Sequence, residues 1–365
     1  MTGIYIHIPF CIKKCPYCDF YSFSAEENHK DSYLTAVLCA LKDKASLVRD
    51  GVDTVYFGGG TPSVFGAERI SRVISCIKDN YRLTDDAEIT VECNPSSVNE
   101  EFMQIIKLAG VNRISMGMQS AVENERKALG RLSDKAQVEY AIACAKKAGI
   151  DNISLDIMLG VPSQTMESLD CSIDFLLGAG IRHISAYMLK IEEGTPFDEA
   201  ESTLALPCED EVCDMYLHTV KRLAENGFLQ YEISNFAKQG YESRHNMRYW
   251  LCDEYIGIGP SAHSFIGGKR YYYSRNFDAY LKGEDWIYDC DGGDEEEYIM
   301  LRLRLAKGLK MREYKEKFGK EIDEEILKKA ERFAMEGLVS VDEEGIRLTE
   351  KGFLLSNTII GELIL

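Results

Sequence analysis

The feature that most constrains the fold of this chain is an alternation of short apolar runs with longer amphipathic segments. Six runs rich in β-branched or aromatic residues are too short for typical helices, and they cover Ile4–Ile8, Thr54–Phe57, Glu88–Glu92, Arg113–Met118, Asn152–Leu159 and His183–Leu189. Helix-length segments lie between them, including Ser32–Val48, Ala67–Asn80, Lys135–Ala148 and Met166–Leu177. Consecutive β-α units predict an α/β fold with a parallel sheet. Because six units are fewer than the eight of a closed barrel, we expect an open partial (β/α)6 barrel.

The alternation stops after Leu189, and three parts are predicted. We expect the barrel over residues 1–205, a helix and loop-rich extension over 206–290, and a smaller C-terminal domain over 291–365. The extension holds a predicted helix at about Glu209–Asn226, followed by an aromatic, loop-rich stretch.

The C-terminal part is predicted to be a winged-helix-like α+β domain. An acidic, glycine-broken run at Asp289–Glu297 is typical of a linker. Beyond it, helices starting near Glu296 and Ile322 precede two short strands around a turn that ends at Gly345. The domain shows no basic recognition helix, which favours a structural or interaction role over DNA binding.

Composition limits the partners and the compartment. The net charge is −18, from 60 acidic and 42 basic residues, whereas binding to nucleic acid needs clustered Lys and Arg. We therefore expect no nucleic acid partner. The sequence has neither a signal-peptide pattern nor an apolar run of about 18 residues, so we expect a cytoplasmic protein. Nine of the twelve cysteines are scattered singly, which favours reduced thiols over disulfides.

The other three cysteines, Cys11, Cys15 and Cys18, form a C-x3-C-x2-C pattern directly after the first predicted strand. Zinc sites usually take four ligands from two separated pairs. Three thiolates in a cubane [4Fe–4S] cluster leave one iron without a cysteine, where a small molecule can bind. The position is the C-terminal mouth of the sheet, where α/β barrels place their chemistry. The alternative is three chance or core cysteines, which this spacing makes improbable.

Polar residues follow other predicted strands. The loop GGGTPS, Gly58 to Ser63, follows the second strand and allows close approach of backbone to a ligand, although a tight turn explains it equally well. Glu92 and Gln119 lie at strand ends, where they could bind a ligand. The alternative for Glu92 is a carboxylate that pairs with a helix N-terminus, and the alternative for Gln119 is a loop residue that bonds the backbone. Asp156 lies within an apolar run, where a carboxylate is costly unless it faces a polar pocket.

These residues resemble the signature of the radical S-adenosylmethionine (SAM) superfamily, in which C-x3-C-x2-C follows the first strand of a partial barrel. The resemblance implies that SAM binds the open iron through its amino and carboxylate groups. It assigns further SAM contacts to Tyr5, Tyr17, Gly59, Gly60, Thr61 and Arg131 of this chain. Considered alone, Arg131 is typical of a solvated helix end, and Tyr5 of a buried strand tyrosine.

Within the superfamily, the chain resembles the oxygen-independent coproporphyrinogen III oxidase family from Ile4 to the C-terminal hairpin. The oxidases carry a further cysteine where this chain has Phe20, and a sizeable segment before the cluster where this chain has ten residues. The stretch HNMRYW, His245 to Trp250, matches the HNxxYW motif of the haem-chaperone members. Its imidazole could bind haem iron, and its aromatic rings could contact a porphyrin. The alternative for His245 is a loop-anchoring hydrogen bond, and His263 is interpreted first as structural and second as a reserve ligand.

The resemblance therefore implies a haem chaperone that binds a [4Fe–4S] cluster, SAM and haem. Its partners would be apo-haemoproteins such as respiratory enzymes, with a transient membrane association and a homodimer both compatible with the group. One alternative is an oxygen-independent coproporphyrinogen III oxidase, in which SAM cleavage drives oxidative decarboxylation of propionate side chains in porphyrin biosynthesis. Another is a purely structural cluster protein, which would need no SAM pocket.

Overall fold

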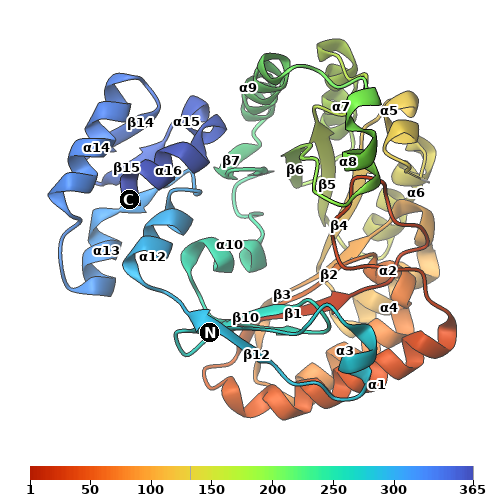
Figure 1. The fold of residues 1–365 in the computed structure, drawn as a ribbon. Coiled ribbons are helices and arrows are strands. Elements are labelled where there is room, and N and C mark those ends of the chain that lie inside the picture. Colours follow the sequence, from red (N-terminus) through yellow and green to blue (C-terminus); the bar gives the residue numbers. More distant parts are fainter. Residues whose placement is uncertain (132, 365) are drawn as a thin grey trace.

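The centre of the molecule is a curved sheet of six parallel strands that lie in sequence order (Figure 1). The structure is a computed structural model and describes residues 1–131 and 133–364. The six strands are β1 (Thr2–Ile8), β2 (Val52–Gly59), β3 (Leu83–Cys93), β4 (Arg113–Gln119), β5 (Asn152–Leu159) and β6 (His183–Met188). Each pairs in parallel with the next, and β6 does not return to β1. The predicted open partial barrel is confirmed.

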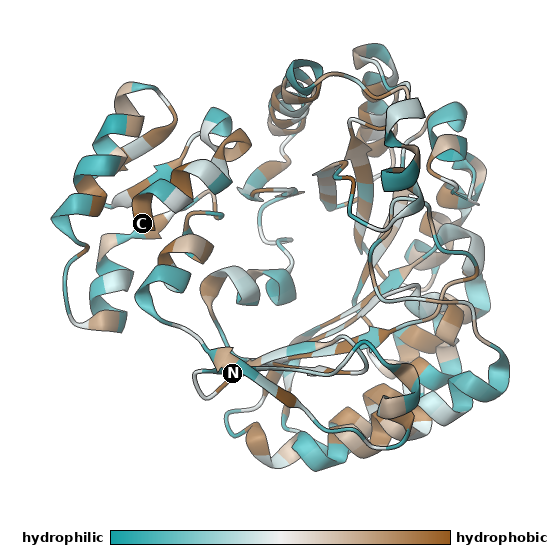
Figure 2. Ribbon diagram, viewed as in Figure 1, coloured by the Kyte–Doolittle hydropathy of each residue, from teal (hydrophilic) through white to brown (hydrophobic). Residues whose placement is uncertain are grey.

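Helices cover the convex face of this sheet (Figure 1). They are α1 (Glu27–Lys44), α2 (Pro62–Phe65), α3 (Ala67–Asn80), α4 (Glu100–Ala109), α5 (Glu123–Ala128), α6 (Lys135–Lys147), α7 (Met166–Gly178) and α9 (Glu209–Glu225). Helix α8 (Pro196–Ala200) instead contacts the loop after β1, where the Phe197 amide donates to the Pro16 carbonyl. Helix α3 has the predicted bounds, whereas α1 begins five residues before the predicted Ser32. The core between sheet and helices contains Ile4, Ile6 and Ile8 of β1, all fully buried, and hydrophobic bands run along these elements in Figure 2.

The concave face of the sheet carries polar residues. Side chains alternate between the faces of a strand, so the neighbours of the buried isoleucines in β1 point to the opposite face. The register extends this face across the sheet through Tyr5, His7, Tyr56, Glu88, Glu92, Arg113, Ser115 and Asp156. A polar concave face at the carboxyl end of parallel strands is where a ligand site is expected.

The sheet continues beyond the barrel on both edges, in the order β12-β11-β10-β9-β1 on one side and β6-β8-β7 on the other. The added strands are β7 (Leu229–Glu232), β8 (Asn235–Ala237), β9 (Tyr255–Ile258), β10 (His263–Ile266), β11 (Lys269–Tyr272) and β12 (Ile287–Asp291). Helices α10 (Arg244–Leu251) and α11 (Phe277–Leu281) connect them. The prediction of a loop-rich stretch here was wrong. The edges of an open sheet present unpaired backbone groups, and these later segments satisfy them.

The C-terminal part is a small α+β unit, as predicted. It comprises α12 (Glu295–Arg302), β13 (Leu309–Lys310), α13 (Met311–Phe318), α14 (Glu324–Met335), β14 (Val339–Asp342), β15 (Gly345–Leu348), α15 (Glu350–Leu354) and α16 (Ser356–Ile364). Its three antiparallel strands have the order β13-β15-β14. The predicted linker is wrong over Asp289–Asp291, because these residues pair with β11 as part of β12. The division into three parts stays a prediction. Among the described residues, no helix is long and apolar enough to cross a membrane.

Candidate functional site

A cavity of about 380 Å³ opens at the carboxyl ends of the central strands. All of the predicted site residues except Tyr5 and His245 line it: Cys11, Cys15, Cys18, Tyr17, Gly59, Gly60, Thr61, Glu92, Gln119, Arg131 and Asp156. They come from the loop after β1 and from the ends of β2, β3, β4 and β5, together with the segment after α5. The fold thus brings together residues that are up to 145 positions apart in the chain.

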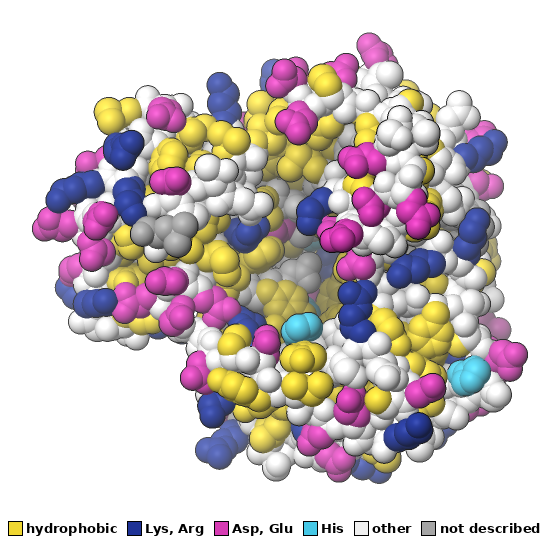
Figure 3. Space-filling model, viewed as in Figure 1, with side chains coloured by type: hydrophobic (Ala, Val, Ile, Leu, Met, Phe, Trp, Pro, Cys, Tyr) yellow, Lys and Arg dark blue, Asp and Glu magenta, His cyan; other side chains and the backbone are white. Residues whose placement is uncertain are grey.

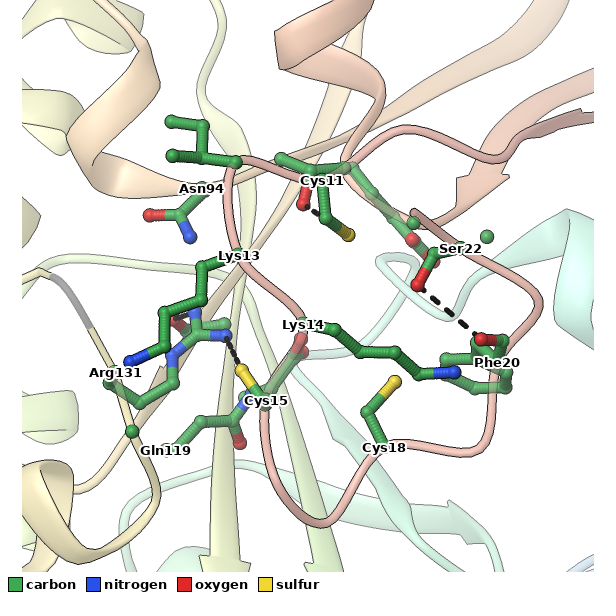
Figure 4. Close-up of a pocket in the computed structure, with 18 of the residues that line it drawn as sticks. Cys11, Lys13, Lys14, Cys15, Cys18, Phe20, Ser22, Asn94, Gln119 and Arg131 are labelled. Atoms are coloured by element: carbon green, nitrogen blue, oxygen red, sulfur yellow. Dashed lines mark hydrogen bonds between the residues drawn. The ribbon is translucent and has the colours of Figure 1, made fainter. Parts of the chain in front are cut away.

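The three cysteines lie on the loop after β1 (Figure 4). Their thiols are free and half-buried. The Cys11 sulfur lies 3.4 Å from Thr61 Oγ1, and Arg131 Nη1 donates a hydrogen bond of 3.7 Å to the Cys15 sulfur. Desolvation raises the pKa of the Cys18 thiol. A bound cation would reverse this effect, because metal coordination deprotonates thiols.

The donor set fits a [4Fe–4S] cluster better than a single metal ion. Among the described residues, no three His, Cys, Asp or Glu side chains are grouped so that they could hold one ion. The cysteines of a cubane cluster bind separate irons and so need not converge on one point. The three thiols border the same cavity, and Arg131 places a positive charge beside Cys15. A cluster with three thiolate ligands is therefore compatible with the loop.

The glycine loop after β2 packs directly against the cysteine loop. The amide of Gly60 donates to the Ile8 carbonyl at 2.8 Å, and that of Thr61 donates to the Phe10 carbonyl at 2.7 Å. A Cβ atom on Gly60 would lie 2.8 Å from the Phe10 carbonyl oxygen and 3.1 Å from the Cys11 sulfur. A side chain here would displace the loop that holds the cysteines, which gives the glycine a packing reason in addition to its place in the cavity.

Two buried carboxyl groups lie on the cavity wall. Glu92 accepts a hydrogen bond of 2.7 Å from the Tyr56 hydroxyl, and Asp156 accepts one of 3.3 Å from Ser115 Oγ. Desolvation raises the pKa of Glu92 to about 7 and that of Asp156 to about 6. The prediction that Asp156 faces a polar pocket agrees with this geometry. Both groups can bind or release a proton near neutral pH.

Gln119 and Arg131 direct unsatisfied polar atoms into the same region (Figure 4). Among the described residues, Gln119 Oε1 and Arg131 Nε are buried without a hydrogen-bond partner. Gln119 also adopts a left-handed backbone conformation, with φ of 69°. Arg131 Nη2 is fixed by the Gly117 carbonyl at 2.5 Å. Buried polar atoms without partners are uncommon in native proteins, and here they provide donor and acceptor capacity for a polar ligand.

Sequence reasoning missed several cavity residues. Asn94 follows β3, Ser115 and Gly117 precede Gln119 on the inward face of β4, and Tyr187 is the last residue but one of β6. The signal for Ser115 and Gly117 was the two-residue period of a strand, since residues two and four before a lining residue share its face. Lys13, Lys14 and Phe20 of the cysteine loop also border the cavity, and no spacing rule identifies them.

Tyr5 and His245 lie on the concave face outside the cavity lining. His245 is fully buried; its Nδ1 lies 2.9 Å from Thr54 Oγ1 and its Nε2 lies 2.9 Å from the Tyr249 hydroxyl. Desolvation lowers the pKa of His245 to about 3, so the ring is neutral. The ring stacks on Tyr56 at 5.2 Å. Both nitrogens are engaged, so this conformation offers none to iron, and haem binding by His245 stays a prediction. The Tyr5 hydroxyl lies 3.1 Å from His7 Nδ1, and its SAM contact also stays a prediction.

Comparison with known proteins identifies the family. The model of the Radical SAM superfamily matches residues 5–176, and that of the HemN C-terminal domain matches residues 295–355. The chain is 33% identical to Heme chaperone HemW of Bacillus subtilis, with 100% of this chain and 99% of the relative covered. It is 33% identical to Heme chaperone HemW of Lactococcus lactis, with 100% and 97% covered. Coproporphyrinogen III oxidase (HemN) from Escherichia coli shares the fold, with a TM-score of 0.85 and 23% identity over 99% of this chain and 89% of that one. The chain therefore belongs to the HemW family of the radical SAM superfamily.

Proposed function

We propose that this protein is a haem chaperone that binds a [4Fe–4S] cluster, SAM and haem, and that passes haem to apo-haemoproteins. The observation that supports it most is the convergence of Cys11, Cys15 and Cys18 with strand-end polar residues in one cavity, in a chain whose full-length relatives are named haem chaperones. Recipients such as respiratory enzymes, a transient visit to a membrane surface and a homodimer are further parts of the proposal.

The cysteine loop and the strand ends have separate tasks in this proposal. Cys11, Cys15 and Cys18, which line the cavity, would hold the cluster, and the iron without a cysteine would bind SAM. The backbone of Gly59 to Thr61, together with the Glu92, Gln119 and Asp156 side chains, orients SAM. When bound, a reduced cluster can supply one electron for SAM cleavage, which is chemistry of the cofactors and not of the chain. Arg131 lies beside Cys15 and can pair with a SAM carboxylate.

One feature favours a chaperone over an oxidase. Phe20 stands where the oxidase pattern has a further cysteine, and its ring is 67% exposed at the cavity mouth. An apolar ring at that place can contact a flat apolar ligand, but it cannot replace a thiol. The oxidase shares the fold of this chain at 23% identity, and a shared fold does not determine the reaction.

The proposal is tested on one anaerobically reconstituted sample. Haem is titrated into it and followed by absorbance, while a parallel aliquot receives reductant, SAM and coproporphyrinogen III. We expect saturable, stoichiometric haem binding and no protoporphyrinogen. Transfer is then measured by mixing the haem-loaded protein with an apo-haemoprotein and following the spectrum of the acceptor. Repeated turnover to protoporphyrinogen with weak haem binding would instead identify an oxidase.

A further inference from the structure

A haem chaperone needs a group that can bind the iron, and most histidines of this chain are already engaged. Three are buried with both ring nitrogens near protein oxygens: His7 with Tyr5 and the Tyr21 carbonyl, His183 with Ser154 and Tyr231, and His245 with Thr54 and Tyr249. His218 Nε2 lies 2.8 Å from an Asp170 carboxylate oxygen. The two others, His29 and His263, are exposed.

His263 differs from His29 in where it lies. His29 belongs to α1, on the convex side of the sheet (Figure 1). His263 begins β10, which pairs with β9, and β9 pairs with β1 in register Tyr5 to Gly257. Phe265 lies opposite Tyr255, Tyr255 lies opposite Gly3 of β1, and His263 is two residues before Phe265 in β10. His263 therefore shares the concave face with Tyr5.

The surroundings of His263 form a flat, partly apolar row. Tyr272 is its cross-strand partner, and the two rings are stacked with centroids 5.7 Å apart and 27° between their planes. Ile287 of β12 lies opposite Tyr272 on the same face and is 36% exposed. Figure 3 shows the hollow on this side of the molecule, bordered by hydrophobic, basic, acidic and histidine side chains.

Gly257 packs directly against the backbone of His263. A Cβ atom at this position would lie 2.1 Å from the His263 carbonyl oxygen, so no other residue fits without moving the strand. No side chain therefore stands between Tyr5 and His263 across β9. Within the described part of the chain, the His263 ring forms no hydrogen bond.

We propose that His263 is the axial ligand of haem iron and that Tyr272 and Ile287 contact the porphyrin. This inference rests on the proposed haem binding and names its site. A neutral imidazole is the form that binds a metal. Desolvation lowers the pKa of His263, with a smaller opposing effect from Asp289 of β12 and a further lowering by Arg270 of β11. The ring is therefore neutral at pH 7.

Helix α10, which carries the HNxxYW motif, then influences haem binding through its contacts with the strands of the sheet. Tyr249, which bonds His245, packs edge-on against Tyr255 with ring centroids 4.7 Å apart. Tyr255 pairs with Phe265, two residues from His263. In this arrangement His245 is a positioning residue, because it holds the element that supports β9 and β10 and does not touch the iron.

The test compares three variants of the full chain after anaerobic cluster reconstitution: His263→Gly, His245→Ala and, as the matched exposed control, His29→Gly. Ferric haem is titrated into each, and both absorbance and electron paramagnetic resonance report the axial ligand. We expect His263→Gly to change both spectra and to weaken haem binding by at least about tenfold. Added imidazole should restore the wild-type spectra in this variant. We expect His29→Gly to match the wild type, and His245→Ala to keep the wild-type spectra with or without weaker binding.

The outcomes separate the two levels of the proposal. Wild-type spectra and affinity in His263→Gly would overturn the assignment, whichever other residue then proves to bind the iron. His245 would be the ligand if His245→Ala changed the spectra, added imidazole restored them, and His263→Gly left the spectra unchanged. If the wild-type protein binds no haem, the proposed function itself fails and the assignment with it. Equal cluster content and circular dichroism in all variants exclude misfolding as the cause.

Discussion

Glu88 and Glu92 are four residues apart in β3 and so lie on the same face of the strand, yet their surroundings differ. Glu88 accepts hydrogen bonds from the backbone amides of Arg244 and His245, at 3.2 and 3.1 Å, and so caps the start of α10. Glu92 accepts one from Tyr56 and otherwise faces the cavity. Glu88 and His245 at the α10 end thus have hydrogen-bond partners, whereas Gln119 Oε1 and Arg131 Nε at the cavity are buried without one among the described residues. Within the same part of the chain, Arg113 Nε and Nη1, on the same face near Glu88, are also buried without a partner. The comparison distinguishes residues whose hydrogen bonds stabilise the fold from residues whose polar atoms are available to bind a ligand.

The largest expected effect is loss of the cluster when the three cavity cysteines are removed together. We expect the Cys11, Cys15 and Cys18 to Ala variant to contain no cluster iron after reconstitution and to lose SAM binding, while it still folds, because a half-buried loop supplies the thiols. Iron analysis, visible absorbance and SAM calorimetry measure this. The matched control replaces three exposed cysteines, Cys39, Cys171 and Cys208. A cluster retained in the first variant would contradict the assignment.

At the α10 end, we expect His245→Ala to act on stability. The change removes the His245 partner of the Tyr249 hydroxyl and one of the two partners of Thr54 Oγ1, which keeps its bond from Arg248 Nε, and it opens a cavity beside Tyr56. Lost hydrogen bonds and lost packing together predict a decrease of about 2–4 kcal/mol in the free energy of unfolding. Urea denaturation of the cluster-free chain measures it, with His29→Ala expected within about 0.5 kcal/mol of wild type. An unchanged stability would mean that the α10 end is not satisfied in solution as it is in this structure.

Packing between the two loops at the cavity can be tested with a single methyl group. Gly60→Ala would place a Cβ atom 2.8 Å from the Phe10 carbonyl oxygen. This contact is too close, so the backbone of one of the two loops must move to relieve it. We expect a loss of about 1–3 kcal/mol in the free energy of unfolding and weaker cluster retention. Gly361→Ala is the matched control, because it lies in α16 with nothing within 4 Å of the added atom. There a small gain of up to about 1 kcal/mol is expected. Equal behaviour of the two variants would contradict the packing argument.

Local patterns predicted the parts of the molecule that local physics determines. The short β-branched runs are all strands, and the rule that parallel strands place function at their carboxyl ends brought Glu92, Gln119 and Asp156 to the cavity. The pairing of β9 with β1 could not be predicted, because it joins residues about 250 positions apart and depends on the exposed edge of the sheet.

The HNxxYW motif also shows what the sequence alone cannot predict about a site. The sequence indicates which residue types are present, but whether an imidazole is available depends on the groups that meet its nitrogens. Thr54 and Tyr249 meet those of His245, and one of these comes from a strand 191 residues earlier. The closeness of Gly257 to the His263 backbone likewise depends on how the strands pack, and the sequence does not show it. Sequence reasoning placed His245 before His263 as the haem ligand, and the proposal that His263 binds the iron reverses this order.

The smallest expected effect is a pH dependence that distinguishes Glu92 from the satisfied groups near α10. Desolvation raises the pKa of Glu92 from 4.5 to about 7, so between these values the folded chain keeps a proton that the unfolded chain has lost. The contribution of Glu92 to stability is therefore full below about pH 4.5 and is lost as the pH rises through 7. We expect the wild-type free energy of unfolding, relative to Glu92→Gln, to fall by roughly 1–2 kcal/mol across this window.

Two variants make that difference specific to Glu92. Asp156 also has a raised pKa and titrates in an overlapping range, so only the difference between wild type and Glu92→Gln isolates the glutamate. Tyr56→Phe removes the hydrogen bond that favours the ionised carboxylate, and we expect it to move the window to higher pH. Urea denaturation of the cluster-free chain from pH 5 to 8 measures all three. A difference that does not change with pH would mean that Glu92 is as well satisfied as Glu88, and the contrast between the two ends of the barrel would then rest on Gln119 and Arg131 alone.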